Sequence, residues 1–180
     1  MAIENIIKDW DRGKYAPLYW LEGEEEYYID KVVNYAEKYI LTKEEASFNL
    51  TIFYGRDTNW ADVINACRRY PMFSERQVVI IKEAQYLKGI EKLESYVQKP
   101  LISTILVVSH KEKKLDSRTR FGKLVKEKGV FESTKKLAEN KLPDWVNNLI
   151  NKLGLSITPL ANTLLVEHIG NDLNRIESEL

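Results

Sequence analysis

Apolar residues recur along this chain at two spacings, one typical of buried strands and one typical of amphipathic helices. The runs QVVIIKEA (residues 77–84) and STILVVSH (residues 103–110) are nearly continuous in β-branched and aliphatic side chains. Strands that are buried on both faces of a sheet have this composition. Shorter apolar stretches predict further strands at residues 17–23 (PLYWLEG), 47–55 (SFNLTIFYG) and 130–133 (VFES).

Between these strands the apolar residues return every three or four positions, which predicts helices. The predicted helices cover residues 24–40, 88–99 and 118–129, and another follows a cap at Asp57 or Thr58. The apolar stripe of that last helix is Trp60, Val63, Ile64 and Cys67. Strands alternating with helices predict a parallel sheet with helices on both faces and right-handed crossovers. The expected fold class is therefore a doubly wound α/β domain over residues 1–136.

The pattern changes after residue 136, where helical spacing continues but strand-like runs stop. Thr158 is expected to cap a helix that has Pro159 at its first position, and Asn171 is expected to cap the final helix. The apolar stripe of this helix continues to Leu180. We therefore expect residues 137–180 to form the first, truncated part of a small all-helical domain.

The composition is that of a soluble globular protein. Of the 180 residues, 44% are hydrophobic and the formal net charge is zero, so no overall field favours nucleic acid or membrane. No apolar run reaches the length that a membrane span needs, and the first residues lack the pattern of a secretory signal. The single cysteine, Cys67, rules out an internal disulfide. We expect a cytoplasmic protein.

Charge is unevenly distributed along the chain. Residues 1–50 contain 11 acidic and 6 basic side chains, whereas residues 110–128 contain 8 basic and 3 acidic ones. The simpler interpretation of the basic segment is a solvated helix face. The alternative is a patch that contacts nucleic-acid phosphates, weakened by the interspersed acids. Its candidate residues are Lys111, Lys113, Lys114, Arg118, Arg120 and Lys123.

The sequence offers little support for catalysis. Doubly wound sheets often bind nucleotides at the turn after the first strand, and here that turn reads LEGEEEYYID. It has one glycine, three consecutive glutamates and no lysine, so it would repel phosphates and lacks a Walker-type site. His110 and His168 stand without a nucleophile motif, and Cys67 lies on an apolar stripe. We expect no catalytic site, cofactor, metal or small-molecule substrate.

The stretch RYPMFSERQVVIIKE (residues 69–83) places two large apolar side chains in a connection between a helix and a buried strand. Pro71 disfavours continuation of the helix, and the preceding helical stripe does not extend to Met72 and Phe73. One interpretation is that the pair covers the edge of the sheet. The other is that the pair is exposed. Exposure of Phe73 alone would lose about 1.5–3 kcal/mol of the stabilising free energy that burial provides, which favours a role in binding a partner.

Four segments in this order, PLYWLEGEEEYYID, CRRYPMFSERQVVIIKEA, STILVVSHKEKKLDSRTR and HIGNDLNRIESEL, resemble the delta subunits of DNA polymerase III clamp loaders. The resemblance covers essentially the whole chain. It implies an AAA+-like first domain without ATP binding, a helical second domain and a C-terminal collar domain that lies outside this sequence. It also implies that loader subunits assemble mainly through the collar, that neighbouring subunits hydrolyse ATP, and that Met72 and Phe73 match the hydrophobic pair with which delta subunits open the sliding clamp.

The leading hypothesis is therefore a non-catalytic subunit of the DNA polymerase III holoenzyme. It would bind the sliding clamp through Met72 and Phe73 and help to open the ring for loading onto primed DNA during replication. The alternative is a stand-alone nucleic-acid-binding module that uses the basic segment. A third hypothesis, a degenerate nucleotidase, is disfavoured by the acidic turn.

Overall fold

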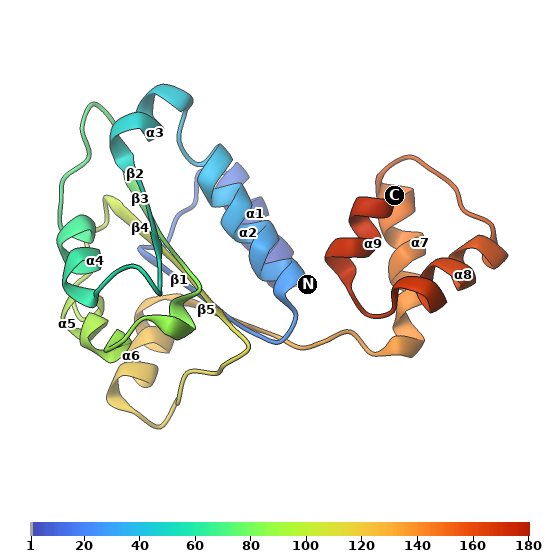
Figure 1. The fold of residues 1–180 in the computed structure, drawn as a ribbon. Helices are drawn as coiled ribbons and strands as arrows, with labels where there is room; N and C mark the ends of the chain where they lie inside the picture. Colours follow the sequence, from blue (N-terminus) through green and yellow to red (C-terminus); the bar gives the residue numbers. More distant parts are fainter. Residues whose placement is uncertain (1) are drawn as a thin grey trace. The chain divides into compact units, whose positions relative to one another are not determined.

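A parallel sheet of five strands organises the first part of the chain in the computed structural model, which describes residues 2–180 (Figure 1). The order across the sheet is β2-β3-β4-β1-β5, and every pairing is parallel. The doubly wound α/β class predicted from the sequence is confirmed. The strands are β1 (Leu18–Gly23), β2 (Leu50–Tyr54), β3 (Gln77–Lys82), β4 (Thr104–Lys111) and β5 (Val130–Thr134).

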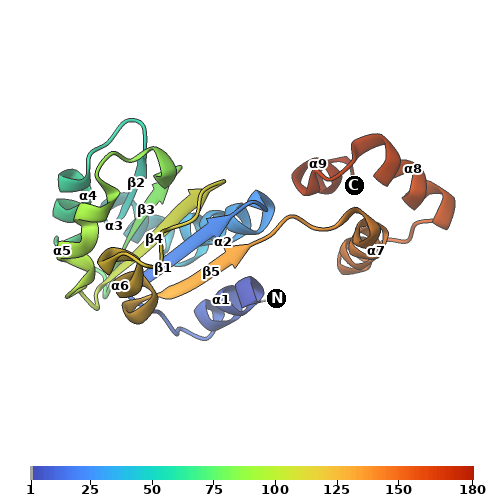
Figure 2. The same cartoon turned by 90° about the horizontal axis from the view of Figure 1, so that it is seen from below.

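Helices cover both faces of the sheet, as Figures 1 and 2 show. On one face lie α1 (Ala2–Asp11) and α2 (Glu26–Tyr39), and on the other lie α4 (Trp60–Cys67), α5 (Glu94–Val97) and α6 (Arg120–Lys128). The central strands β3 and β4 are almost fully buried, which explains their continuous apolar runs. Short 3₁₀ turns, η1 (Ala84–Tyr86) and η2 (Ile90–Leu93), connect β3 to α5, so the helix predicted over residues 88–99 is split in two.

The predicted strand over residues 47–55 is wrong at its beginning. Residues 47–49 belong to a helix, α3 (Lys43–Asn49), and the strand starts only at Leu50. The helix forms because Thr42 and Glu45 make a capping box, in which each side chain accepts a hydrogen bond from the other's backbone N–H. The cap of α4 also differs from the prediction, since Asn59 occupies it in place of Asp57 or Thr58.

A second unit begins at Lys135 and consists of helices in the part of the chain that the structure describes. Thr158 caps α8 as predicted, whereas Asp172, and not Asn171, caps α9. None of the helices between residues 2 and 180 is long and apolar enough to span a membrane. The elements of this unit are η3 (Glu139–Lys141), α7 (Leu142–Lys152), α8 (Pro159–Ile169) and α9 (Leu173–Glu179).

Candidate functional site

The connection between α4 and β3 carries its apolar side chains on the outside; we call residues 70–76 the apolar turn. Phe73 is 92% exposed and Met72 is 53% exposed, with Tyr70 exposed beside them. Phe73 also has a φ of 54°, in the left-handed region that non-glycine residues seldom adopt. Such a backbone persists only where surrounding contacts over-determine it. The apolar turn must therefore be held by its neighbours.

Those contacts come from a residue 23 positions earlier in the chain. Strands β2 and β3 pair in parallel with Leu50 beside Val78, so the segments that enter them meet at the amino-terminal edge of the sheet. Asn49 directly precedes β2 and is buried. Its Oδ1 accepts a hydrogen bond from the Met72 N–H (2.7 Å), and its Nδ2 donates to the Met72 carbonyl (2.9 Å). One side chain thus satisfies both backbone polar groups of Met72.

Glu45 holds the apolar turn on the other side of Phe73. Its carboxylate accepts hydrogen bonds from the Thr42 N–H (2.9 Å) and from the Ser74 hydroxyl (2.8 Å). These bonds, the one from the Thr42 backbone first, lower the pKa of Glu45. Glu45 and Asn49, which we call the α3 clasp, therefore fix the residues on both sides of Phe73.

Sequence reasoning did not identify the α3 clasp. The capping-box pattern of Thr42 and Glu45 was the available signal for α3, and it lay just before the segment interpreted as a strand, residues 47–55. The bonds from Asn49 to Met72 depend on the pairing of β2 with β3, which no local pattern reveals.

The far end of the apolar turn is anchored by Gln77, the first residue of β3. Its buried Nε2 donates to the Ala66 carbonyl (3.1 Å) and to the Thr104 hydroxyl (2.8 Å). The Thr104 hydroxyl donates in turn to the Cys67 carbonyl (2.9 Å). These bonds reinforce the end of α4, where the Ala66 carbonyl also accepts a backbone hydrogen bond from the Arg69 N–H (3.3 Å). The apolar turn is consequently fixed where it leaves α4 and where it enters β3.

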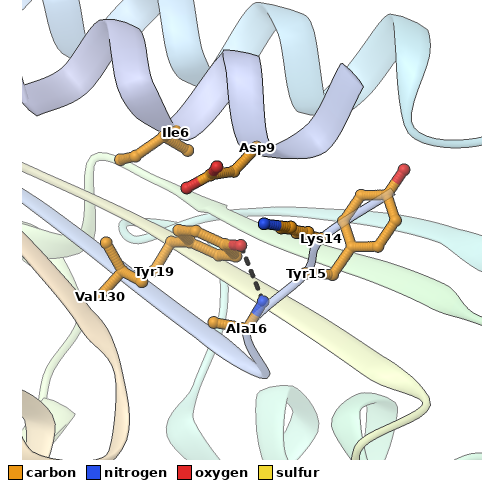
Figure 3. Close-up of a pocket in the computed structure, with 7 residues that line it drawn as sticks. All are labelled: Ile6, Asp9, Lys14, Tyr15, Ala16, Tyr19 and Val130. Carbon is orange, nitrogen blue, oxygen red and sulfur yellow. Dashed lines mark hydrogen bonds between the residues drawn. The ribbon is translucent and has the colours of Figure 1, made fainter. Parts of the chain in front are cut away.

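A pocket of about 260 Å³ lies at the same edge of the sheet, between α1 and the first residues of β1 and β5 (Figure 3). The Arg76 guanidinium lies 4.4 Å from the centre of the Tyr15 ring, one wall of the pocket. Arg76 thereby links the pocket to the apolar turn. The Ala16 N–H donates to the Tyr19 hydroxyl (2.8 Å), as the dashed line in Figure 3 marks. The lining residues are Ile6, Asp9, Lys14, Tyr15, Ala16, Tyr19 and Val130.

The opposite, carboxyl-terminal edge of the sheet is where doubly wound proteins bind nucleotides. There the Lys111 ammonium, at the end of β4, lies 3.0 Å from a carboxylate oxygen of Glu26 and 2.8 Å from one of Asp30. Burial of the ammonium opposes its charge, yet the hydrogen bonds to Asp30 and Glu26 raise the pKa of Lys111 above its usual value. Lys111 is already satisfied by these carboxylates, so this corner presents acidic groups that would repel a phosphate.

His110 and Cys67 are both built into the core. The His110 ring packs against Trp20, its Nδ1 lies 3.0 Å from the Lys113 carbonyl, and burial lowers its pKa. Cys67 is buried, which raises the pKa of its thiol to about 12. Neither side chain is placed to act as a nucleophile or base on a substrate from solvent. Among residues 2–180 no group of three His, Cys, Asp or Glu side chains could hold a metal ion.

The structure spreads the six basic candidates over different environments. Lys111 is engaged at the carboxyl-terminal edge, Arg118 is bonded to Asp116 (2.9 Å), and Arg120 lies 3.1 Å from Glu94. The Arg118 guanidinium lowers the pKa of Asp116 to about 2. Three lysines remain exposed along the segment between the end of β4 and the middle of α6, namely Lys113, Lys114 and Lys123.

A family model for the delta subunit of DNA polymerase III matches residues 19–142. The chain belongs to this family. DNA polymerase III subunit delta of Bacillus subtilis is 27% identical to this delta-family chain, over 98% of the chain and 54% of the relative. The solved structure of the Bacillus subtilis DNA clamp loader delta protein matches with a TM-score of 0.79 and 26% identity, over 98% of this chain and 55% of that one.

More distant solved structures share the fold alone. A mutant of Thermotoga maritima RuvB matches with a TM-score of 0.55 at 14% identity, over 98% of this chain and 57% of that one. Domain III of the Thermotoga maritima replication initiation protein DnaA matches with a TM-score of 0.55 at 11% identity, over 98% and 79%. The predicted family and the AAA+-like α/β fold are confirmed. The delta-family chain spans about half the length of the Bacillus subtilis relatives.

Proposed function

We propose that this delta-family chain binds the sliding clamp through Met72 and Phe73 and helps to open the ring for loading onto primed DNA. Phe73 carries this proposal, because it is 92% exposed on a turn that its own fold holds in place. An exposed phenylalanine forgoes about 1.5–3 kcal/mol of burial, which a pocket on the partner would recover. Aromatic anchors in such pockets dominate the affinity of many interfaces, and the adaptable Met72 side chain would fill the space beside it.

Ring opening requires more than affinity. A bound protein favours an open ring only by the difference between its affinities for the open and closed states. We propose that the rigid apolar turn supplies this difference, because a fixed wedge cannot relax to follow a closing interface. The chain itself would contribute no catalysis to the holoenzyme. Hydrolysis of ATP would fall to neighbouring loader subunits, and these subunits would contact this protein mainly through a collar domain.

A titration of the clamp from the same organism tests the proposal. Phe73→Ala should weaken binding by at least about 2 kcal/mol, which is roughly thirtyfold. Tyr54→Ala is the matched control, because Tyr54 is an exposed aromatic residue at the opposite edge of the sheet, at the end of β2. Equal affinities of wild type and Phe73→Ala would remove Phe73 from this role.

The second candidate function, binding of nucleic acid, is supported by the exposure of Lys113, Lys114 and Lys123. Phosphate contacts make binding fall steeply with salt, since each neutralised phosphate releases counterions. Binding of primed DNA to the isolated chain at low salt, lost as salt rises, would support this function. An absence of binding at low salt would dismiss it for the isolated chain.

A further inference from the structure

We infer that Asn49, assisted by Glu45, is a positioning residue that holds Met72 and Phe73 in their binding conformation before the clamp arrives. The inference rests on the proposed function and assigns a role to residues that never need to touch the partner. Asn49 is only 2% exposed, so a partner cannot reach its side chain without displacing the apolar turn.

The hydrogen bonds of Asn49 indicate what its side chain is for. The end of α3 does not require it, because the Leu50 N–H already closes the helix on the Ala46 carbonyl. The side-chain amide instead bonds to both backbone groups of Met72, and its nitrogen donates further to the Glu45 carbonyl (3.0 Å). Two of the three side-chain hydrogen bonds of Asn49 therefore go to the residue that precedes Phe73.

The backbone of Phe73 explains why such support is needed. A left-handed phenylalanine is unfavourable by itself, so a released turn would populate other conformations. The apparent dissociation constant rises by the reciprocal of the fraction of molecules that remain competent to bind. If release of the α3 clasp leaves about a tenth of the molecules in the binding conformation, the affinity falls about tenfold.

The test is a titration of the clamp with Asn49→Ala in the 180-residue chain, for which we expect about a tenfold loss of affinity. The control is Asn59→Ala, which removes hydrogen bonds to the Ala61 and Asp62 N–H groups at the start of α4 but none to the apolar turn. It should destabilise the same unit and leave clamp affinity unchanged. In the free Asn49→Ala chain, the Met72 amide should also exchange with solvent faster than in wild type.

A double-mutant cycle separates positioning from a general structural effect. Asn49→Ala should cost affinity in the wild-type background and almost nothing when Phe73 is already alanine. A folded Asn49→Ala chain with wild-type affinity would overturn the inference, and so would an equal loss in both backgrounds. The proposed function fails separately, if Phe73→Ala alone leaves affinity unchanged.

A milder variant serves if Asn49→Ala does not fold. Ser74→Ala removes the hydrogen bond to Glu45 and a longer one from the Arg76 N–H (3.4 Å), and leaves those of Asn49 intact. It should weaken clamp binding about threefold, a smaller effect because Asn49 still holds Met72. This loss should likewise disappear when Phe73 is alanine. Unchanged affinity of Ser74→Ala, with faster exchange of the amides around it, would show that the held conformation is not required.

Discussion

The side chain of Asn49 bonds to both backbone polar groups of Met72, which lies 23 positions further along the chain. The two residues meet because each precedes one of two neighbouring parallel strands, β2 and β3. These bonds fix the connection between α4 and β3 to the amino-terminal edge of the sheet. The position of the exposed Phe73, which follows Met72, therefore depends on contacts from a distant part of the chain.

Substitutions of Met72 should depend on shape and polarity. Met72→Leu is expected to keep clamp affinity within about threefold, because leucine has a similar volume and is also apolar. Met72→Lys should lose most of the affinity, because a charge would be buried without a partner in the pocket of the clamp. Titration of the clamp checks both variants. Tight binding by Met72→Lys would show that this side chain stays in solvent in the complex.

The left-handed backbone at Phe73 makes a prediction about stability. Phe73→Gly should leave the free energy of unfolding unchanged or raise it by up to about 1 kcal/mol, because glycine adopts this conformation freely and the exposed ring buries little. Phe73→Val should lower it, since a β-branched residue fits the left-handed region poorly. Urea unfolding measures the two variants side by side. Greater stability of Phe73→Val than of Phe73→Gly would contradict a held left-handed turn.

Lys111 should stabilise the first unit through its carboxylate partners. Lys111→Met is expected to cost about 1 kcal/mol near neutral pH, a modest figure because Glu26 and Asp30 remain partly exposed to water. The pKa of Lys111 is raised in the folded chain, so its stabilisation is complete below the unfolded-state pKa of about 10.4 and is lost as pH rises through the folded value.

Urea unfolding of wild type and Lys111→Met checks this pH dependence. The difference in unfolding free energy should be constant from about pH 7 to pH 9 and shrink above about pH 10.5. Lys88→Met is the control, because Lys88 is exposed and should show no such difference. A gap between wild type and Lys111→Met that stays constant across this whole range would contradict the ion pairing.

The exposed lysines give a prediction for nucleic-acid binding. Replacing Lys113, Lys114 and Lys123 together with glutamine should weaken binding to primed DNA. The slope of log binding constant against log salt concentration should become less steep, by the equivalent of up to about three neutralised phosphates. Arg118→Gln should have a smaller effect, because Asp116 already neutralises that guanidinium. Filter binding or anisotropy at several salt concentrations measures the slopes. An unchanged slope in the triple variant would exclude these lysines from phosphate contact.

The sheet could be predicted from the sequence because β3 and β4 are buried on both faces and their runs are apolar throughout. Pro71 and the end of the helical stripe predicted that Met72 and Phe73 leave the core contacted by the preceding helix, but these local features left open whether the pair covers the sheet edge or is exposed. The structure exposes Phe73. The α3 clasp could not be predicted, since Asn49 carries no local sign of its distant partner. Helix α3 was not predicted, because the alternation of apolar residues over positions 48–54 was interpreted as a strand. The capping residue Thr42 lies before that run.

The two edges of the sheet are about 20 Å apart, the length of a six-residue strand. Substitutions at such a distance, with no shared partners, are additive in free energy. Substitutions in the acidic corner around Lys111, even ones designed to bind a new small molecule, should therefore leave the conformation of the apolar turn beside Asn49 unchanged. For protein engineering, the two edges of the sheet can be redesigned separately and the resulting substitutions then combined.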